Sequence, residues 1–301
     1  MAISTPVRAR RGITEFVSSK GVESKSLSPR AIRKIVLEQS KRADVGHIGS
    51  CLSVAHILCA LYRDVLRISS PDDPDRDRFV LSKGHAGLAL YGVLRLKGWI
   101  SDAELNTFCG GNSRFGVHPE NVVSGIDFSS GSLGQGLTIA AGSAMAARIQ
   151  RSGRHTYCLI SDAECNEGSV WEAAMFAGHH KLDNLTVIVD WNGQQALGRT
   201  CDVIDCASLP QRWKAFGWRT TEVDGHSIAE LVAAFGPKPQ ADDRSPHVIL
   251  ARTRFGMGVS FMEAGVSLTQ THLPVHAINW HYLPMSDFEY QTAMDELDSE
   301  D

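Results

Sequence analysis

Hydrophobic and polar positions follow two different periods along this chain. Short apolar runs bounded by polar or glycine-containing turns are typical of buried strands, and they occur at residues 79–81, 157–160, 185–190, 220–223 and 248–251. Longer segments with helical spacing occupy residues 28–42, 53–65, 86–97, 133–150, 167–181 and 286–297. This alternation predicts an α/β fold with a doubly wound, mostly parallel sheet.

Two of the predicted helices begin with recognisable caps. Ser28 followed by Pro29 places a hydroxyl at the N-cap and proline at the first helical position. Ser101 with Glu104 three residues later is a capping-box pattern. We therefore expect an N-terminal arm (residues 1–27), one domain (28–285), and a C-terminal helix with an acidic tail (286–301).

Two oxygen-bearing side chains follow neighbouring predicted strands. Asp162 comes just after the run at 157–160, and Asn192 comes just after the run at 185–190. The carboxyl ends of parallel strands share one edge of the sheet, where ligands bind. A carboxylate and a carboxamide suit a hard cation, Mg²⁺ or Ca²⁺, that bridges to phosphate oxygens.

Composition narrows the class of protein. The chain has 301 residues, 43% hydrophobic and 21% charged, as in an ordinary globular protein. A net charge of −4 gives no basic field for nucleic acid or an anionic membrane, and no apolar stretch is long enough to span a bilayer. Seven cysteines without a Cys-x-x-Cys pair favour buried thiols in a reducing, cytoplasmic setting.

The first 27 residues contain several arginines and serines, as transit peptides do. Glu15 and Glu23 argue against a transit peptide, so we favour the N-terminal arm.

Several ordered motifs resemble the N-terminal, diphosphate-binding part of transketolases. Asp162-x-Glu164 followed by Asn192 is similar to the thiamine-diphosphate motif, although Ser161 and Ala163 stand where glycines are usual. The other motifs, in family order, are Gly46-His47-Ile-Gly-Ser, Ser82-Lys-Gly-His85, Val117-His118-Pro119, Gly131-Ser-Leu-Gly-Gln-Gly136, Asn166-Glu-Gly-Ser-Val-Trp-Glu172, Ala177-Gly-His-His and Gly256-Met-Gly-Val-Ser-Phe-Met-Glu263.

The resemblance implies thiamine diphosphate as cofactor, with Mg²⁺ or Ca²⁺. The metal ligands would be Asp162, Asn192 and the backbone carbonyl of Gln194. Cofactor contacts, direct or through a carboxylate network at the subunit interface, would come from His85, Gly131, Ser132, Leu133, Asp162, Ala163, Glu164, Glu167, Glu172 and Asn192. Alanine at 163 adds one methyl group near the diphosphate, which predicts a weaker cofactor affinity at most.

The resemblance also implies which histidines act on the substrate. His47 and His118 would line the substrate channel, hydrogen-bond the reacting end of a ketose and help to move protons. After Glu263 the family pattern continues with Trp-His-Gly, whereas residues 268–270 here are Leu-Thr-Gln. We expect His272 to replace the missing histidine, and we expect the altered segment to change the sugar or sugar-phosphate substrate.

The implied function is transfer of a two-carbon ketol unit from a ketose to an acceptor. The motifs account only for the diphosphate half of a transketolase. The resemblance therefore implies a partner, a C-terminal pyrimidine-domain subunit that supplies the activating glutamate, in an α2β2 assembly. Two alternatives stay open: the α subunit of a 2-oxoacid dehydrogenase, which would lack the Gly46-His47 and His118 motifs, and a non-catalytic transketolase paralogue.

Overall fold

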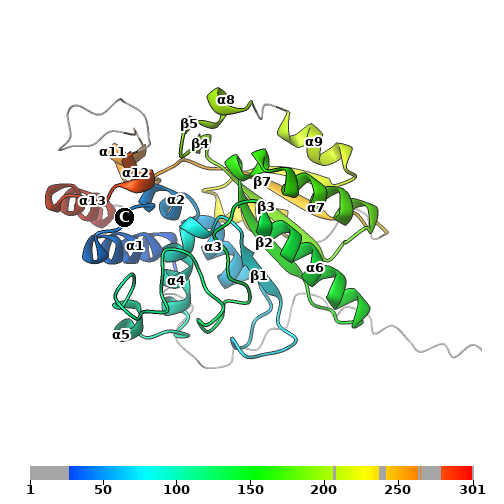
Figure 1. The fold of residues 1–301 in the computed structure, drawn as a ribbon, viewed down its shortest axis with the longest axis horizontal. Coiled ribbons are helices and arrows are strands. Elements are labelled where there is room, and N and C mark those ends of the chain that lie inside the picture. Colours follow the sequence, from blue (N-terminus) through cyan, green and yellow to red (C-terminus); the bar gives the residue numbers. More distant parts are fainter. Residues whose placement is uncertain (1–26, 206–207, 237–241, 264, 266–278, 300–301) are drawn as a thin grey trace, which may run out of the picture.

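A five-stranded parallel sheet forms the centre of the molecule, in the order β1-β2-β3-β7-β6 (Figure 1). The computed structural model describes residues 27–205, 208–236, 242–263, 265 and 279–299. The strands are β1 (Arg78–Leu81), β2 (Thr156–Ser161), β3 (Leu185–Trp191), β6 (Arg219–Asp224) and β7 (His247–Arg252). Ser161 of β2, Asp190 of β3 and Ala251 of β7 stand in register, so the three strands end together at one edge.

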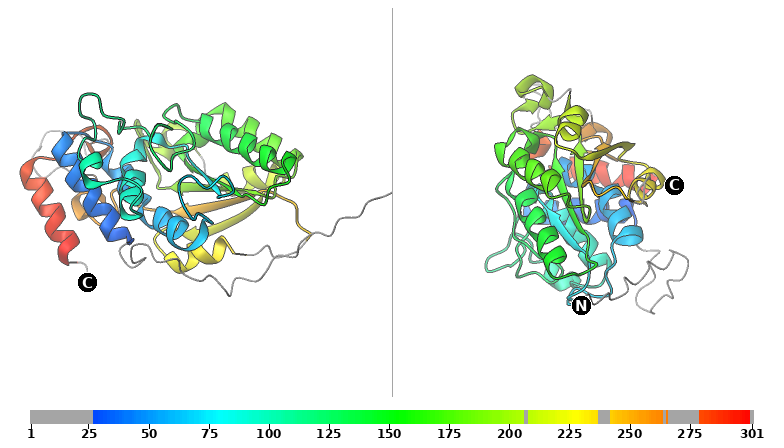
Figure 2. Two further views of the ribbon diagram at one scale, coloured as in Figure 1. Left: turned by 90° about the horizontal axis from the view of Figure 1, so that it is seen from below. Right: turned by 90° about the vertical axis from the view of Figure 1, so that its right-hand side faces the viewer.

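Alternate residues of each strand enter different cores, because successive side chains point to opposite faces of a sheet. On β2, Tyr157 and Leu159 belong to one core, whereas Cys158 and Ile160 belong to the other. Both faces are thus covered, as expected when a parallel sheet reads as a continuous apolar run. Figure 2 shows helices on both sides of the sheet.

The helices sort by face. One face is covered by α6 (Gln135–Ile149), α7 (Gly168–His179) and α9 (Leu209–Ala215). The other face is covered by α1 (Pro29–Ala43), α3 (Ala55–Ala60), α4 (Gly87–Leu96) and α10 (Ile228–Ala234). The doubly wound α/β fold predicted from the sequence is confirmed.

Shorter elements lie mostly near the edges of the sheet. They are α2 (Ile48–Ser53), the π-helix η2 (Leu61–Val65), the 3-10 helices η3 (Gly84–Ala86) and η4 (Ala163–Asn166), α5 (Asp102–Leu105), the hairpin strands β4 (Gln194–Gln195) and β5 (Gly198–Arg199), α8 (Thr200–Val203), α11 (Ser260–Glu263), α12 (Asn279–Tyr282) and α13 (Asp287–Ser299). Helix α13 packs on α1 and places Ala293 and Leu297 in the same core. The division at residue 286 therefore stays a prediction, and residues 1–26 lie outside the described part.

The capping predictions hold in the structure. Ser28 Oγ accepts a hydrogen bond from the backbone N–H of Ala31, 3.1 Å away, and Pro29 begins α1. Ser101 and Glu104 form the full capping box of α5. The sequence did not predict α9, α10 or the β4–β5 hairpin, and the helix predicted over 53–65 belongs to a longer, broken run through α2, α3 and η2.

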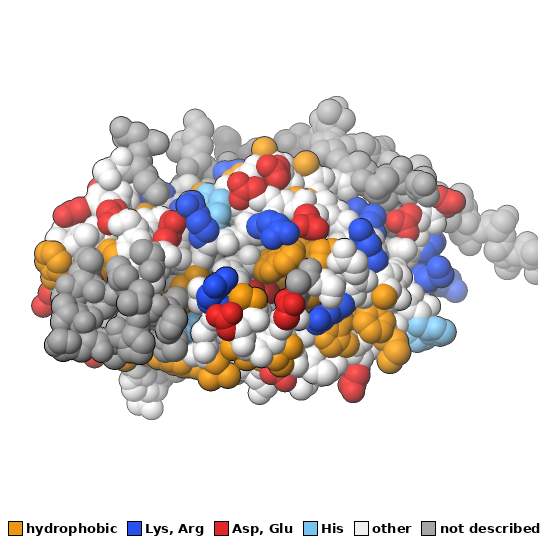
Figure 3. All heavy atoms as spheres, turned by 90° about the horizontal axis from the view of Figure 1, so that it is seen from above, with side chains coloured by type: hydrophobic (Ala, Val, Ile, Leu, Met, Phe, Trp, Pro, Cys, Tyr) orange, Lys and Arg blue, Asp and Glu red, His pale blue; other side chains and the backbone are white. Residues whose placement is uncertain are grey.

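The surface and helix lengths agree with the expected partner classes. On the face that carries α8, β4 and β5, Lys and Arg side chains alternate with Asp and Glu side chains (Figure 3). No helix within the described residues is long and apolar enough to cross a membrane.

A pair of half-buried histidines joins α1, α3 and the loop before α10. Arg33 Nη2 lies 3.0 Å from His56 Nδ1, and His226 Nδ1 lies 3.4 Å from the same atom. The backbone N–H of Arg254 donates to His226 Nε2 at 2.8 Å. These contacts are consistent with two neutral rings, His226 donating from Nδ1 to His56. Burial, with Arg33 adding to it, lowers the pKa of His56 to about 3 and the pKa of His226 to about 4.

This pair predicts a loss of stability as the pH falls from 7 to 4. An unfolded histidine takes up a proton near pH 6.5, whereas the folded pair does so only near 3 to 4, so the unfolded state binds more protons in between. Each ring contributes at most about 1.4 kcal/mol per pH unit to the free energy of unfolding. Urea unfolding measured at several pH values should give a shallower dependence for His56→Gln than for wild type. Exposed His179→Gln should leave the dependence unchanged; parallel curves for wild type and His56→Gln would contradict this account.

Candidate active site

Asp162 lies buried where β2 ends and η4 begins. Its Oδ1 accepts from the backbone N–H of Ala163 at 2.9 Å. Its Oδ2 accepts from the N–H of Gly193 at 2.9 Å and from Thr200 Oγ1 at 3.0 Å. Because Gly193 follows Asn192, these bonds bring together the two chain segments that the sequence paired.

Asn192 and Gln194 lie in the turn after β3. Gly193 between them has a φ of +72°, a left-handed conformation that favours glycine. Asn192 Oδ1 accepts from the N–H of Gln194 at 2.9 Å, and Gln194 begins β4. A cleft of about 370 Å³ opens beside this turn, lined in part by Trp191, Asn192 and Gln194.

The donors at this edge fit a hard divalent cation held against a diphosphate. Burial, followed by the nearby carboxylate of Asp190, raises the pKa of Asp162 to about 7, so the carboxylate is short of positive charge. No group of three or more His, Cys, Asp or Glu side chains in the described residues is arranged to hold a metal. Carboxylate, carboxamide and carbonyl oxygens, completed by ligand oxygens, are the donor set that Mg²⁺ accepts.

Glu164 lies in the same turn but is fully engaged by the protein. Its Oε1 accepts from Ser82 Oγ and from the N–H of Gly134 at 2.7 Å, and its Oε2 accepts from the N–H of Ser161 at 3.2 Å. Burial raises the pKa of this carboxyl. Glu164 thus ties the start of α6 to the ends of β1 and β2, while Ala163 is partly exposed beside it.

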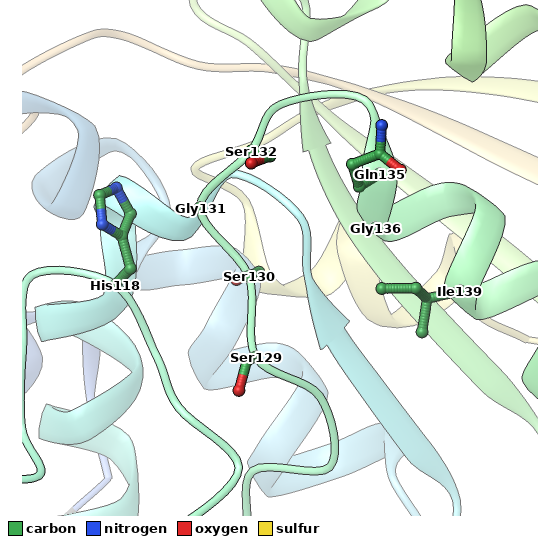
Figure 4. Close-up of a pocket in the computed structure, with 8 residues that line it drawn as sticks. All are labelled: His118, Ser129, Ser130, Gly131, Ser132, Gln135, Gly136 and Ile139. Atoms are coloured by element: carbon green, nitrogen blue, oxygen red, sulfur yellow. The ribbon is translucent and has the colours of Figure 1, made fainter.

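The turn that bears His85 packs against the loop predicted to contact the aminopyrimidine. A Cβ on Gly84 would lie 2.9 Å from the backbone N of Gly131, so glycine permits this approach. The ring of His118 lies against Gly131 from the other side, since a Cβ there would be 3.2 Å from its Cγ. Figure 4 shows the loop through Ser132 running between His118 and the start of α6, beside a cleft of about 530 Å³.

Three histidine rings meet at the same edge of the sheet. The ring centroids of His47, His85 and His281 lie 5.6 to 5.9 Å apart. His47 has a φ of +61°, and its N–H donates to the carbonyl of His281 at 3.0 Å. A Cβ on Gly46 would lie 2.3 Å from the carbonyl oxygen of Tyr282, so only glycine permits this clamp on α12.

These rings are neutral at physiological pH. Burial and, after it, His118 lower the pKa of His47. Burial and then the Lys83 ammonium group hold the pKa of His85 well below its usual value. Burial and His47 lower the pKa of His281 to about 4. His47 Nδ1 is buried without a hydrogen-bond partner among the described residues, as suits a group that awaits a ligand.

His281 is the site residue that sequence reasoning missed. We expected the family histidine to be absent and His272 to replace it, but His272 lies outside the described residues. The dipeptide Trp280-His281 has the same order as the Trp-His of the family pattern, displaced toward the C-terminus. Helix α12 carries this histidine into the cluster, where its ring stacks on Phe255 with centroids 5.4 Å apart.

The remaining predicted residues lie around the start of α6. Leu133 is partly buried just before the helix. Glu167, the N-cap of α7, lies close to Gly134, whose added Cβ would be 2.7 Å from the Glu167 Cβ. Glu167 and Glu172 are both at least partly exposed, as carboxylates at a subunit interface would be in one isolated chain.

Comparison with known proteins agrees with this geometry. Residues 24–289 match the family described as transketolase, thiamine diphosphate binding domain. One of the two subunits of the apulose-4-phosphate transketolase of Phocaeicola vulgatus is 37% identical over 278 residues, covering 92% of this chain and 94% of that protein. The 6-deoxy-6-sulfo-D-fructose transketolase subunit SqwG of a Clostridium species is 37% identical over 272 residues, covering 89% and 94%.

Solved transketolases share the fold but are longer. The Campylobacter jejuni enzyme superposes with a TM-score of 0.79 at 27% identity, covering 93% of this chain and 43% of that one. Human transketolase is 40% identical over 232 residues, which cover 75% of this chain and 36% of that protein. The chain thus spans less than half of these enzymes but nearly the whole length of the Phocaeicola and Clostridium proteins. By its sequence and its fold, the chain belongs to the thiamine-diphosphate-binding domain family of the transketolases.

Proposed function

We propose that this chain is the diphosphate-binding subunit of a two-chain transketolase that moves a two-carbon ketol unit between sugars or sugar phosphates. The observation that carries the proposal is the meeting of two groups at one sheet edge. Asp162 is bonded to the turn of Asn192, and the His47–His85–His281 cluster lies at the same edge. The main alternative, a 2-oxoacid dehydrogenase, is less well supported because every relative named above is a transketolase.

Each residue would have a defined task. Asp162, Asn192 and the Gln194 carbonyl would hold Mg²⁺ or Ca²⁺ against the diphosphate of thiamine diphosphate. When bound, this cofactor supplies the carbon nucleophile and electron sink for cleaving a ketose. His85 would contact the diphosphate.

The histidines would act on the substrate. Neutral His47 and His281 each offer one donor and one acceptor nitrogen to the hydroxyl and carbonyl groups of the sugar. His118, beside Gly131, would orient the reacting end and move protons.

The partner would cover α6 and α7, which pack side by side (Figure 1). Ile149 of α6 and Met175 and Phe176 of α7 are exposed apolar side chains, 76%, 56% and 42% accessible. Gly142 is exposed on the same helix as Ile149, and a Cβ there would meet nothing within 4 Å. Small and apolar residues on adjacent helices suit a closely packed subunit interface, which we propose for a pyrimidine-domain chain in an α2β2 assembly.

The proposed function is tested with a ketol-transfer assay of the assembled enzyme. Ketose and aldose substrates are supplied with thiamine diphosphate and Mg²⁺, and the products are followed by mass. Replacing His281 with Ala should lower kcat by about 10²- to 10⁴-fold with little change in cofactor affinity, because a general acid–base group is lost.

His272→Ala is the matched comparison and should remain near wild type. A larger loss for His272→Ala would restore the expectation drawn from the sequence. Decarboxylation of a 2-oxoacid without ketol transfer would contradict the proposed function.

A further inference from the structure

Asp190 is a fully buried carboxylate directly beneath the cation site. It occupies the next-to-last position of β3, two residues before Asn192. The tasks assigned above do not use it, although a buried carboxylate without a purpose is costly to maintain.

Four donors from four segments meet on this carboxylate. Its Oδ1 accepts from Thr253 Oγ1, just after β7. Its Oδ2 accepts from Lys83 Nζ, from Ser53 Oγ of α2 at 2.9 Å and from Asn192 Nδ2 at 2.9 Å. Three of these segments also carry site residues: Lys83 lies two residues before His85, and Ser53 ends the helix that begins after His47.

The bond to Asn192 decides which way its amide faces. Asn192 Nδ2 donates to Asp190, while Asn192 Oδ1 accepts from the N–H of Gln194. A carboxylate accepts hydrogen bonds and cannot donate them, so the amide nitrogen must face Asp190. The oxygen is thereby turned away from the core, toward the turn that would hold the cation.

Lys83 is what permits a charged acceptor at this depth. Both side chains of the Lys83–Asp190 ion pair are 0% exposed. Removing one partner of a buried pair leaves an uncompensated charge, whereas removing both charges is often tolerated. The pair therefore separates into a stability role, which a double replacement preserves, and an orienting role, which it does not.

We propose that Asp190, held by Lys83, is a positioning residue that fixes Asn192 with its oxygen toward the cofactor cation. This inference rests on the proposed function, since it assigns a second layer to the same cation site. Residues that orient a metal ligand typically matter by about 10- to 100-fold in metal affinity.

The experiment measures Mn²⁺ binding to the full chain in the presence of thiamine diphosphate. Electron paramagnetic resonance follows the loss of the free Mn²⁺ signal, and the melting temperature of each cofactor-free variant is measured alongside. Asp190→Asn should weaken Mn²⁺ binding about 10- to 100-fold. The double variant Lys83→Met with Asp190→Asn should recover melting temperature relative to the single variant while its Mn²⁺ affinity stays low.

Two further variants complete the test. Asn192→Asp, at a half-buried loop position, should also weaken Mn²⁺ binding, because two carboxylates would then face each other. Asp127→Asn breaks another largely buried ion pair, with Arg76, and should lower stability without changing Mn²⁺ affinity.

Three outcomes would overturn the inference: wild-type Mn²⁺ affinity in the double variant, unchanged or tighter binding by Asn192→Asp, or an equal loss in Asp127→Asn. If wild type itself takes up no Mn²⁺ with thiamine diphosphate, the proposed cofactor site is wrong and the inference falls with it.

Discussion

Replacing Asp162 with Ala should remove metal-dependent binding of thiamine diphosphate while leaving the protein folded. The variant loses the only carboxylate among the proposed cation ligands, so the loss should exceed the roughly 100-fold seen for residues that merely orient a ligand. Calorimetric titration with thiamine diphosphate, with and without Mg²⁺, measures it.

The cofactor-free variant should melt no lower than cofactor-free wild type. Burial and Asp190 raise the pKa of Asp162 to about 7, so the fold disfavours its charged form near neutral pH. Relief of that penalty offsets the hydrogen bonds lost from Gly193 and Thr200. Such an exchange of stability for function is common at active sites.

Asp77→Ala is the matched control for this prediction. Asp77 is also a buried carboxylate, bonded to Arg67 and to the N–H of His155, but it precedes β1 at the amino end of the sheet. Its loss should lower the melting temperature and spare cofactor affinity. Unchanged cofactor affinity in folded Asp162→Ala would remove Asp162 from the cation site.

The sheet and its edge could be predicted because local signals and tertiary structure agree there. Apolar runs buried on both faces are characteristic of parallel strands, and an oxygen ligand after each of two neighbouring runs has one place to go. The bond between Asp162 and the N–H of Gly193 fulfils that expectation. The caps at Ser28 and Ser101 were equally local and equally predictable.

The parts that sequence reasoning missed depend on contacts between distant segments. His281 reaches His47 because the carbonyl of His281 accepts from the N–H of His47, which spacing along the chain does not reveal. Asp190 looked like the end of an apolar run, and only the fold brings Lys83 and Thr253 to it. Glu164 was predicted to contact the cofactor, yet its oxygens are bonded within the protein, so that contact stays a prediction.

Purified alone, the 301-residue chain should show no ketol transfer, and activity should appear when a pyrimidine-domain partner is added. The resemblance to transketolases assigns the activating glutamate to the pyrimidine domain, and the site residues found here all serve the diphosphate and reacting-carbon side. An obligate interface of this kind buries more than about 2,000 Å². Analytical ultracentrifugation and the ketol-transfer assay should therefore change together over a partner titration. Robust turnover by the chain alone would refute the two-chain proposal.

The same titration can locate the interface. Met175→Lys puts a charge on the exposed face of α7, so it should abolish both assembly and turnover by burying an unpaired ammonium group. Phe288→Lys, on α13 at the other end of the molecule, changes an equally exposed apolar residue and should leave both unaffected (Figure 1). If Phe288→Lys blocks assembly and Met175→Lys does not, the partner binds beside α13. In that case the carboxylates Glu167 and Glu172 would have no place in a shared network, because they lie with α7.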